Sequence, residues 1–441
     1  MTVTEQYRIS ARTSAGLVEE IELAVSEGSL APGERLPSVR ALAAQGGLSP
    51  STVAAALAEL RRRGLVVTDG RRGTRVATPA RSAAGPALPT PPAGARDLSR
   101  GNPDPQLLPD VGAALARCTP PARLYGDPPV MPGLERLAVR ELGSVREGQA
   151  LCVVSGALEG LELLLQSSLR PGDRVAVENP GYASLFDLLR ANGLRLQPVA
   201  VDGRGMLPEA LEAALRGGAV AAVMTPRGQN PTGALLDGER AGELAAVLAR
   251  HPRVLGIEDD HLGMLGDGPL HSSLGRCERW AVATSVSKAL GPDLRLALLR
   301  GDPHTVARVQ LRQQCGPGWV SWVLQTLVVE LWGSRSVQRL LNGARERYRE
   351  RREGFLGRLH ERGIEATGPS GLNVWVPVPE ESAVVAGLLA RGWVVAPGAL
   401  FRLGSSPPAV RVTTATMTDG ESARLAEDLA GILLAGASRS G

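Results

Sequence analysis

Lysine is almost absent from the chain. Its 441 residues include 49 basic side chains, of which 48 are arginine and one, Lys288, is lysine. Surface lysines tolerate replacement by arginine, whereas an amine that attacks a carbonyl does not, because a guanidinium stays protonated and forms no Schiff base. Composition alone therefore makes Lys288 a candidate nucleophile. The alternative is that one lysine remains by chance.

Cysteines and long apolar runs are also scarce. No stretch of 18 apolar residues occurs, and the first ten residues lack an apolar core, so we expect neither a membrane span nor a signal peptide. With 43% apolar and 21% charged residues, the composition excludes wholesale disorder. The scattered cysteines exclude a disulfide scaffold and a zinc ribbon and indicate a reducing cytoplasm. These cysteines are Cys118, Cys152, Cys277 and Cys315.

Residues 1–78 predict a small separate domain. A helical pattern covers 13–27, a second short helix follows Ser38, and a third begins at the good N-cap Ser49. Two short strand-like runs around a glycine-rich turn come next. The order helix, helix, turn, helix, hairpin is typical of a winged helix-turn-helix.

The rest of the chain predicts a linker and a large α/β domain. Residues 79–97 contain five prolines and six alanines and no plausible core, as in a semi-extended linker. Residues 98–441 alternate strand-like and helical segments, which predicts a mostly parallel sheet with helices on both faces. The charged stretch 345–353 predicts an exposed, ion-paired helix. We expect strands at 151–154, 174–178, 220–225, 254–258, 280–284 and 296–299, and helices such as 157–169 and 237–250.

Positive charge is concentrated at the end of the small domain. Residues 60–76 contain six arginines against one acid, Asp69, although residues 1–78 have only ten arginines against eight acids. Such focused charge suits a duplex backbone, but a solvated arginine-rich face has the same composition.

The residue pattern of this region favours DNA binding. The pattern Gly28-x-x-x-Pro32-Gly33-Glu34-x-Leu36-Pro37-Ser38-x-Arg40-x-Leu42-Ala43, followed by Ser49-x-x-Thr52-Val53 and Gly64-Leu65, resembles the DNA-binding domain of GntR-type transcription regulators. The resemblance implies a double-stranded DNA operator as partner. It also implies that Ser38 and Arg40 contact phosphates or base edges, that Ser49, Ser51 and Thr52 open the recognition helix, and that Arg71 and Arg72 of the wing contact the minor groove or the backbone.

The neighbourhood of Lys288 is suited to a phosphate. The lysine follows a strand-like run, where open α/β sheets place their sites. Hydroxyls at Ser285 and Ser287, with Arg295 seven residues after the lysine, provide donors for a phosphate group. An amine beside a phosphate-binding cup indicates pyridoxal phosphate (PLP), whose aldehyde forms an imine with lysine.

Three more segments that follow strands fit the same cofactor. Asp259, in 255–261, offers a carboxylate to the protonated ring nitrogen, and Asn230, in 225–233, a hydrogen bond to the phenolic oxygen. The helix start at Gly156, Ala157 and Leu158 offers backbone amides to the phosphate. Taken singly, these segments are equally an exposed acidic loop, a turn and an ordinary helix start.

Together the segments make residues 98–441 resemble a fold type I aminotransferase domain with a small α+β subdomain. With its GntR-like head, the whole chain resembles the MocR-type subfamily of GntR regulators. That resemblance implies a homodimer with sites at its interface. It assigns the aldimine to Lys288, the pyridine nitrogen to Asp259, the phenolic oxygen to Asn230 and ring contact to Tyr182. It also assigns an effector carboxylate to Arg411 and the phosphate of the partner subunit to Tyr125. The phosphate of the same subunit is assigned to Gly156, Ala157, Ser285 and Arg295. The family has a tyrosine that donates to the phenolic oxygen of PLP where this chain has His261. Histidine can also donate to this oxygen, but it titrates near neutral pH.

Three functions fit these residues. The first is a cytoplasmic, PLP-dependent transcription regulator that senses PLP or an amine or amino acid. The second is a working aminotransferase with an appended DNA-binding head. The third is a repressor whose large domain only dimerises, and the retained Lys288 argues against it, since dimerisation requires no amine there.

Overall fold

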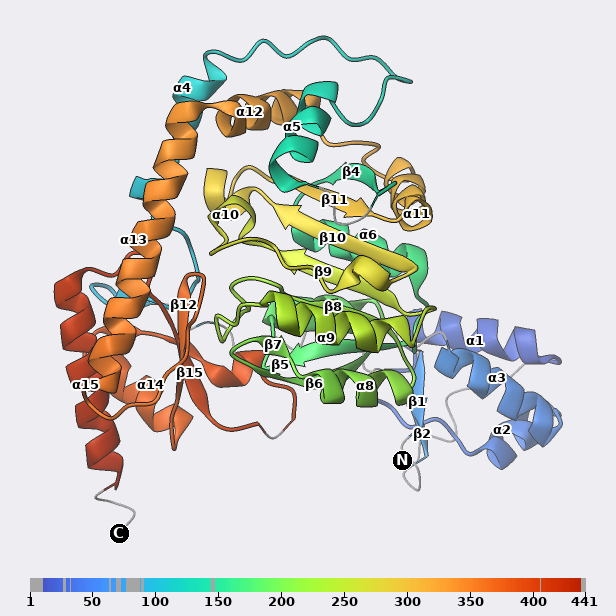
Figure 1. Cartoon of the computed structure of the whole chain (residues 1–441). Helices are drawn as coiled ribbons and strands as arrows, with labels where there is room; N and C mark the ends of the chain where they lie inside the picture. The colour runs from blue at the N-terminus through green and yellow to red at the C-terminus, as the bar shows by residue number, and fades with distance from the viewer. Residues whose placement is uncertain are drawn as a thin grey trace. The chain divides into compact units, whose positions relative to one another are not determined.

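The computed structural model of the chain divides into two compact units (Figure 1): an N-terminal unit, residues 1–85, and a large unit that contains the bulk of residues 86–441. Among the described residues, no helix is long and apolar enough to cross a membrane. The described residues are 11–26, 29–31, 33–62, 65–68, 73–76, 88, 91–143, 147–404 and 406–437.

The N-terminal unit has the predicted order of elements. It contains α1 (Ser14–Ser26), α2 (Val39–Gly46), α3 (Pro50–Arg62), β1 (Val66–Thr68) and β2 (Thr74–Val76), the two strands forming an antiparallel hairpin. One face of each helix enters a common core that includes Leu17, Ile21, Leu42, Val53 and Leu57, each at most 3% exposed. Apolar residues at helical spacing produced this core, so the winged helix-turn-helix prediction is confirmed.

The turn between α2 and α3 depends on glycine. Gly47 caps α2 with φ of 60°, a left-handed conformation that glycine adopts without steric cost. Ser49 then accepts a hydrogen bond from the Thr52 amide at 3.0 Å and so caps α3, as predicted.

The large unit is built on one eight-stranded sheet. β5, β8, β9 and β10 are parallel neighbours, as predicted. β11 is antiparallel to both β10 and β4. Only residues 286–296 connect β10 to β11, which is too short a connection for a parallel crossover between these two strands. In spatial order the strands are β4 (Ala150–Val154), β11 (Ala297–Gly301), β10 (Arg279–Ser285), β9 (Leu255–Asp260), β8 (Ala219–Met224), β5 (Arg174–Asn179), β6 (Arg195–Asp202) and β7 (Gly205–Met206).

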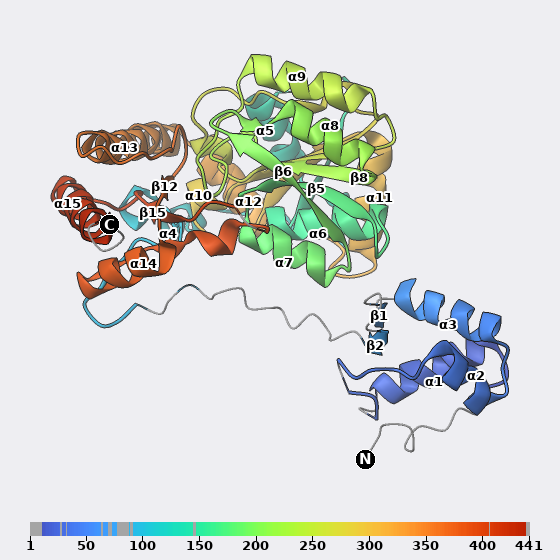
Figure 2. The ribbon, with the colours of Figure 1, turned by 90° about the horizontal axis from the view of Figure 1, so that it is seen from below.

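Helices cover both faces of this sheet (Figure 2). On one face, α8 (Pro208–Arg216) and α9 (Gly238–Ala249) share a core with side chains of β5, β8 and β10. On the other face, α6 (Ala157–Ser168) and α11 (Pro303–Gln314) pack against β10 and β11. The nearly continuous apolar strands are therefore buried on both sides. Further helices of this unit are α4 (Val111–Leu115), α5 (Pro132–Leu142), α7 (Ala183–Ala191), α10 (Ser287–Leu290) and α12 (Trp322–Gly333).

A smaller subdomain follows the long helix α13 (Arg335–His360). Its core contains Phe355 and Leu359 of α13, whereas Leu341 and Tyr348, nearer the start of the helix, belong to the core of the sheet region. α13 thus links the two cores. The subdomain contains β12 (Asn373–Pro377), β15 (Ala409–Thr413), β14 (Ala396–Pro397), α14 (Glu381–Ala390) and α15 (Asp419–Ala437), together with β13 (Trp393–Val394), which pairs with β3 (Arg96–Asp97).

The charged stretch 345–353 lies within α13. Exposed ion pairs, such as Arg349 with Glu346, confirm the predicted solvated face. The opposite side of the same stretch is buried, however. Arg352 is 2% exposed and donates to the carbonyls of Gly371 and Pro369. A charge pattern alone did not reveal that arginine's structural role.

Candidate functional site

Five of the predicted ligand-binding residues lie at the carboxyl ends of five strands with a common direction. Gly156 follows β4, Tyr182 follows β5, Asn230 follows β8, Asp259 is the penultimate residue of β9, and Lys288 follows β10. The pairing directions place all five strand ends at one edge of the sheet. Ligands of open α/β sheets bind at this edge, and we call this group the ligand site.

Lys288 lies in the short helix α10, and its Nζ donates to the carbonyl oxygen of Gly101 at 2.6 Å. Burial, with a smaller contribution from the charge of Arg411, lowers the pKa of Lys288 to about 8. A larger fraction of neutral amine is therefore present near neutral pH than for an exposed lysine, which makes the side chain a better nucleophile.

Asp259 has an unsatisfied acceptor. It is 7% exposed, and its Oδ1 has no hydrogen-bond partner among the described residues. Burial, and next the charge of Asp260, raises the pKa of Asp259 to about 7. Glu258, Asp259 and Asp260 are all buried, so the alternative interpretation of this segment as an exposed acidic loop is wrong. A buried carboxylate lacking a donor fits a ligand that presents a positively charged N–H group.

The neighbours of Asp259 on β9 have partners of their own. Asp260 forms a buried ion pair with Arg227 at 2.6 Å, and Glu258 accepts from the amide and hydroxyl of Ser273, each at 2.8 Å. Alternate residues of a strand point to opposite faces, so Asp259 differs from both neighbours in its surroundings.

His261, at the position of the family's tyrosine, follows Asp260 directly. Burial, and next the charge of Lys288, lowers its pKa to about 4. The ring is therefore neutral at pH 7, and only one of its nitrogens carries a hydrogen to donate. Neutral imidazole and tyrosine hydroxyl each donate one hydrogen bond, so the substitution retains this capacity.

Arg411, on β15, joins the subdomain to the ligand site. Its Nη1 donates to Asn230 Oδ1 at 2.9 Å and its Nη2 to the carbonyl of Ser99, while its guanidinium lies 4.6 Å from the ring centre of Phe401. Burial lowers the pKa of Arg411 to about 10. The structure thus brings together Arg411 and Asn230, which are 181 residues apart.

Gly156 and Arg295 lie close together at the start of α6. Gly156 has φ of 103°, and a Cβ on it would lie 2.6 Å from Arg295 Nη2. A side chain at 156 would therefore displace the guanidinium, so both residues can face one anion. The amides of Ala157 and Leu158 begin the twelve-residue helix.

The hydroxyls near Lys288 differ in their availability. Ser285 Oγ accepts from the Ser287 amide at 3.2 Å and keeps its own hydrogen to donate. Ser287 Oγ donates instead to the carbonyl of Leu294 at 3.2 Å, which braces the turn before Arg295. Tyr182 precedes α7. It lies close enough to Arg411 to raise the pKa of that guanidinium, against the larger effect of burial.

Tyr125 lies on the segment between α4 and α5. Its side chain is 93% exposed, and its ring contacts Trp319 edge to face, with centroids 5.7 Å apart. The Arg123 guanidinium lies over the Trp319 ring, 3.7 Å from its centroid. Tyr125 is therefore an exposed side chain that packs against an aromatic neighbour.

Sequence reasoning missed Glu178, the penultimate residue of β5. It accepts from the amide and hydroxyl of Thr225, at 3.0 and 2.9 Å, and from Gln229 at 3.2 Å. Burial raises its pKa to about 7, and the charge of Asp259 adds to this rise. Its position as the one acid in an apolar strand was the available signal. The backbone carbonyls of Ser99 and Gly101 gave none.

In the N-terminal unit, two of the predicted DNA-contacting hydroxyls, those of Ser38 and Ser49, cap helices. Ser38 Oγ accepts from the Ala41 amide at 3.2 Å, and Ser49 Oγ lies 2.7 Å from the hydroxyls of both Ser51 and Thr52. Arg40 is exposed on α2. The wing residues Arg71 and Arg72 lie outside the described residues.

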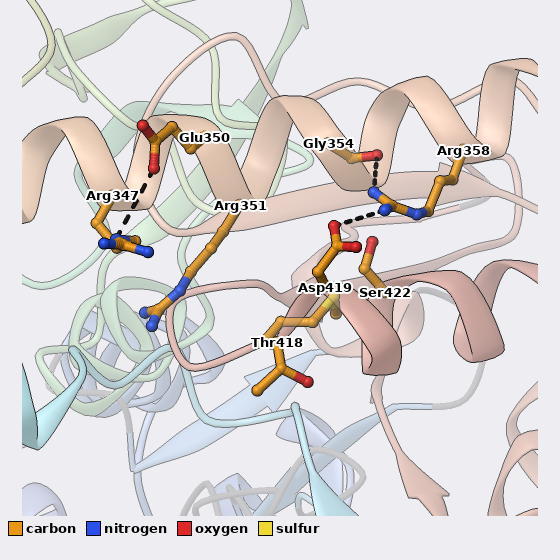
Figure 3. A pocket seen from close by; sticks show the side chains of 9 residues that line it. Arg347, Glu350, Arg351, Gly354, Arg358, Thr418, Asp419 and Ser422 are labelled. Carbon is orange, nitrogen blue, oxygen red and sulfur yellow. Dashed lines mark hydrogen bonds and ion pairs between the residues drawn. The ribbon is translucent and has the colours of Figure 1, made fainter.

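A separate surface pocket lies between α13 and the start of α15 (Figure 3). Arg347, Arg351 and Arg358 line it together with the acids Glu350 and Asp419, so its charges are nearly balanced. Arg358 donates to both Asp419 and the carbonyl of Gly354. Its lining includes none of the predicted ligand-binding residues.

Comparisons with known proteins agree with both units. Residues 95–429 match the family model for aminotransferase class I and II, and residues 13–76 match bacterial regulatory proteins of the gntR family. The chain is 39% identical over 425 residues to the vitamin B6 salvage pathway transcriptional repressor PtsJ of Salmonella typhimurium, covering 96% of this chain and 98% of the relative.

Two further likenesses extend this result. The HTH-type transcriptional regulator TauR of Rhodobacter capsulatus is 28% identical, over 90% of this chain and 92% of the relative. Pyrococcus horikoshii kynurenine aminotransferase has a similar structure, with a TM-score of 0.71 and 21% identity over 78% of this chain and 92% of that one. At this identity, the structural likeness shows the fold alone.

Proposed function

Because the chain belongs to the MocR-type subfamily of GntR regulators, with a gntR head and an aminotransferase class I and II domain, we propose that it is a cytoplasmic transcription regulator controlled by PLP. The N-terminal domain, 1–78, binds a double-stranded DNA operator, the linker is 79–97, and the domain 98–441 binds PLP together with an amine or amino acid effector.

The main observation in support of the cofactor is the unpaired Oδ1 of Asp259, at the same edge of the sheet as Lys288. When bound, PLP supplies an aldehyde carbon that amines attack and a ring that withdraws electrons. Asp259 Oδ1 accepts the ring N–H and so keeps the ring nitrogen protonated. Lys288 holds the aldehyde end, since its lowered pKa provides neutral amine.

The remaining residues fit the rest of the cofactor. Gly156 and Arg295, brought together by the absence of a Cβ, bind the phosphate. The amides of Ala157 and Leu158 and the hydroxyls of Ser285 and Ser287 complete the cup, with Ser287 acting through the turn it braces. Asn230 and His261 hold the phenolic oxygen, Tyr182 contacts the ring, and Arg411 binds the effector's carboxylate.

A homodimer explains the exposed position of Tyr125. Its 93% exposed side chain is held by Trp319. In the proposed dimer it reaches the phosphate of the partner subunit, so each site is completed by the other copy. Two copies also supply two DNA-binding heads for two half-sites.

In the head, the recognition helix is α3. Ser38 and Arg40 on α2, and Ser49, Ser51 and Thr52 at the start of α3, contact the operator, with Arg71 and Arg72 in the wing. Helix starts offer backbone amides to phosphates, and the capping hydroxyls hold these starts in place.

The test is a pair of titrations on the full chain. The visible absorption of PLP-loaded protein is recorded as amines and amino acids are added singly, and operator affinity is measured with and without PLP. A persistent shifted band with one compound, and a PLP-dependent operator affinity, are expected. Decay of the band with release of a keto acid would instead identify an aminotransferase with an appended head. Absence of any band would refute the cofactor.

A further inference from the structure

The two cations of the ligand site donate to the backbone of one short segment. Lys288 Nζ donates to the carbonyl of Gly101 at 2.6 Å, and Arg411 Nη2 donates to the carbonyl of Ser99. Both acceptor residues are buried. We call residues 96–101 the entry segment, because they begin at the end of the linker.

Gly101 gives the entry segment the shape that these contacts need. Its φ of 64° is left-handed, a conformation that glycine adopts without steric cost. Its amide donates to Thr413 Oγ1 at 3.0 Å. Lys288 and Arg411 thus hold two carbonyls only two residues apart, one from each side of the ligand site.

The upstream end of the entry segment is anchored in the subdomain. The amides of Arg96 and Leu98 donate to the carbonyls of Gly392 and Val394, both at 2.8 Å. The Arg96 side chain donates to Glu421 at 2.8 Å and to the carbonyl of Thr416 at 2.7 Å. The last linker residues are therefore part of the subdomain's structure.

The chain just downstream of the entry segment is held by α13. Asp104 receives a hydrogen bond from Arg351 at 2.8 Å, and its amide donates to the hydroxyl of Tyr348 at 3.0 Å. Figure 3 shows Arg351 on α13, beside the start of α15. Because the chain is held on both sides of this segment, a change in hydrogen bonding at Ser99 and Gly101 must also alter the flanking contacts.

Ligands compete with the entry segment for its donors. A cofactor bound through Lys288 withdraws the amine from Gly101, and an effector carboxylate on Arg411 withdraws the guanidinium from Ser99. Each withdrawal leaves a buried carbonyl without a partner, which is unfavourable unless the segment moves.

We infer that the carbonyls of Ser99 and Gly101 are part of the ligand site, and that the entry segment transmits ligand occupancy to the linker of the DNA-binding head. This inference rests on the proposed function. It states what a ligand changes: the hydrogen bonds at the point where the linker enters the large domain. Such differential contacts are what an allosteric ligand requires.

The first test is amide hydrogen exchange of residues 96–101 in the full chain. The amides of Arg96, Leu98, Ser99 and Gly101 are all hydrogen-bonded, so their exchange is slow without ligand. PLP should accelerate it about tenfold, a typical allosteric factor. Lys288→Ala removes the donor directly, so exchange should be fast without PLP and unchanged by it. Slow exchange in this variant would overturn the inference.

The second test separates binding from transmission. Arg96→Gln removes the anchor on Glu421 and Thr416 without touching Lys288, Asp259 or Arg411. The variant should keep the PLP absorption band but lose the PLP-dependent change in operator affinity. Arg216→Gln, which removes a more exposed ion-paired arginine from α8, is the control and should retain both.

The outcomes distinguish the two proposals. If PLP gives no absorption band, the proposed function fails. If the band is present but exchange at 96–101 is unchanged, or if Arg96→Gln retains the full PLP response, the proposed function stands and the entry segment does not transmit occupancy.

Discussion

In the N-terminal unit, Ser38 and Ser49, predicted to contact DNA, bond to close neighbours, whereas Lys288 and Arg411 of the ligand site bond to distant parts of the chain. Ser38 and Ser49 accept from amides three residues away. Lys288 donates to a carbonyl oxygen 187 residues away, and Arg411 donates to the side-chain oxygen of Asn230, 181 residues away. The head is built from local sequence, while the ligand site exists only when the large domain folds. Single substitutions should therefore weaken DNA binding only partly in the head, but should strongly reduce PLP binding in the ligand site.

The largest expected effect is that of Lys288→Ala. The visible band of bound PLP should disappear, and borohydride should no longer attach the cofactor to the chain, since no other lysine is present. The fold should persist, because the side chain supports no core. Tryptophan fluorescence monitors this directly, as all six tryptophans lie at or after Trp280. A retained band with intact fluorescence would show that the lysine assignment is wrong.

Asp259→Asn should have the next largest effect. It leaves the ring N–H of PLP without a charged acceptor, and losing one partner of a buried charge pair costs about 2–5 kcal/mol, so affinity should fall by roughly 30-fold or more. Equilibrium dialysis of PLP measures this. Glu258→Gln, one residue earlier and already paired with Ser273, is the matched control and should change affinity little. Equal losses in both variants would argue against a specific role for Asp259.

Glu178→Gln should alter the pH dependence of stability. The folded pKa of Glu178, about 7, lies above its ordinary value of 4.5, so its contribution is present below about pH 4.5 and is lost as pH rises through about 7. In this window the wild-type protein without cofactor should lose up to about 1.4 kcal/mol per pH unit relative to the variant. His261 has the opposite slope between about pH 4 and 6.5, but it is present in both proteins.

Denaturant unfolding at pH 5 to 8, followed by tryptophan fluorescence, measures this difference. Parallel stability curves for wild type and Glu178→Gln would show that this carboxyl does not titrate within the window.

The smallest effect is expected in the head. Arg40→Gln should weaken operator binding, and the slope of log affinity against log salt should become shallower by about one for the lost phosphate contact. Fluorescence anisotropy at several salt concentrations measures the slope, with Arg216→Gln as control. An unchanged affinity at every salt concentration would place the DNA on another face of the head.

The same contrast explains what sequence reasoning predicted. Lys288, Asp259 and Gly156 each stand in a short motif at or just after the end of an apolar strand, so their type and position could be predicted from local pattern. Glu178 lies in a strand without a motif, and its relation to Asp259 arises from the spatial neighbourhood of β5, β8 and β9. Ser99 and Gly101 contribute carbonyls, which every residue possesses, so no residue type marks them.

The sequence by itself determined the elements of this protein: the amphipathic helices of the head, the apolar strands of the sheet, and a single amine placed after one of them. Local spacing and side-chain chemistry suffice for such features, because each is decided within a few residues. Tertiary structure decided which groups share a donor or remain without one. It left Asp259 unpaired and joined Lys288 and Arg411 to the entry segment, because hydrogen-bond partners far apart in the chain are chosen only by the packing that buries them.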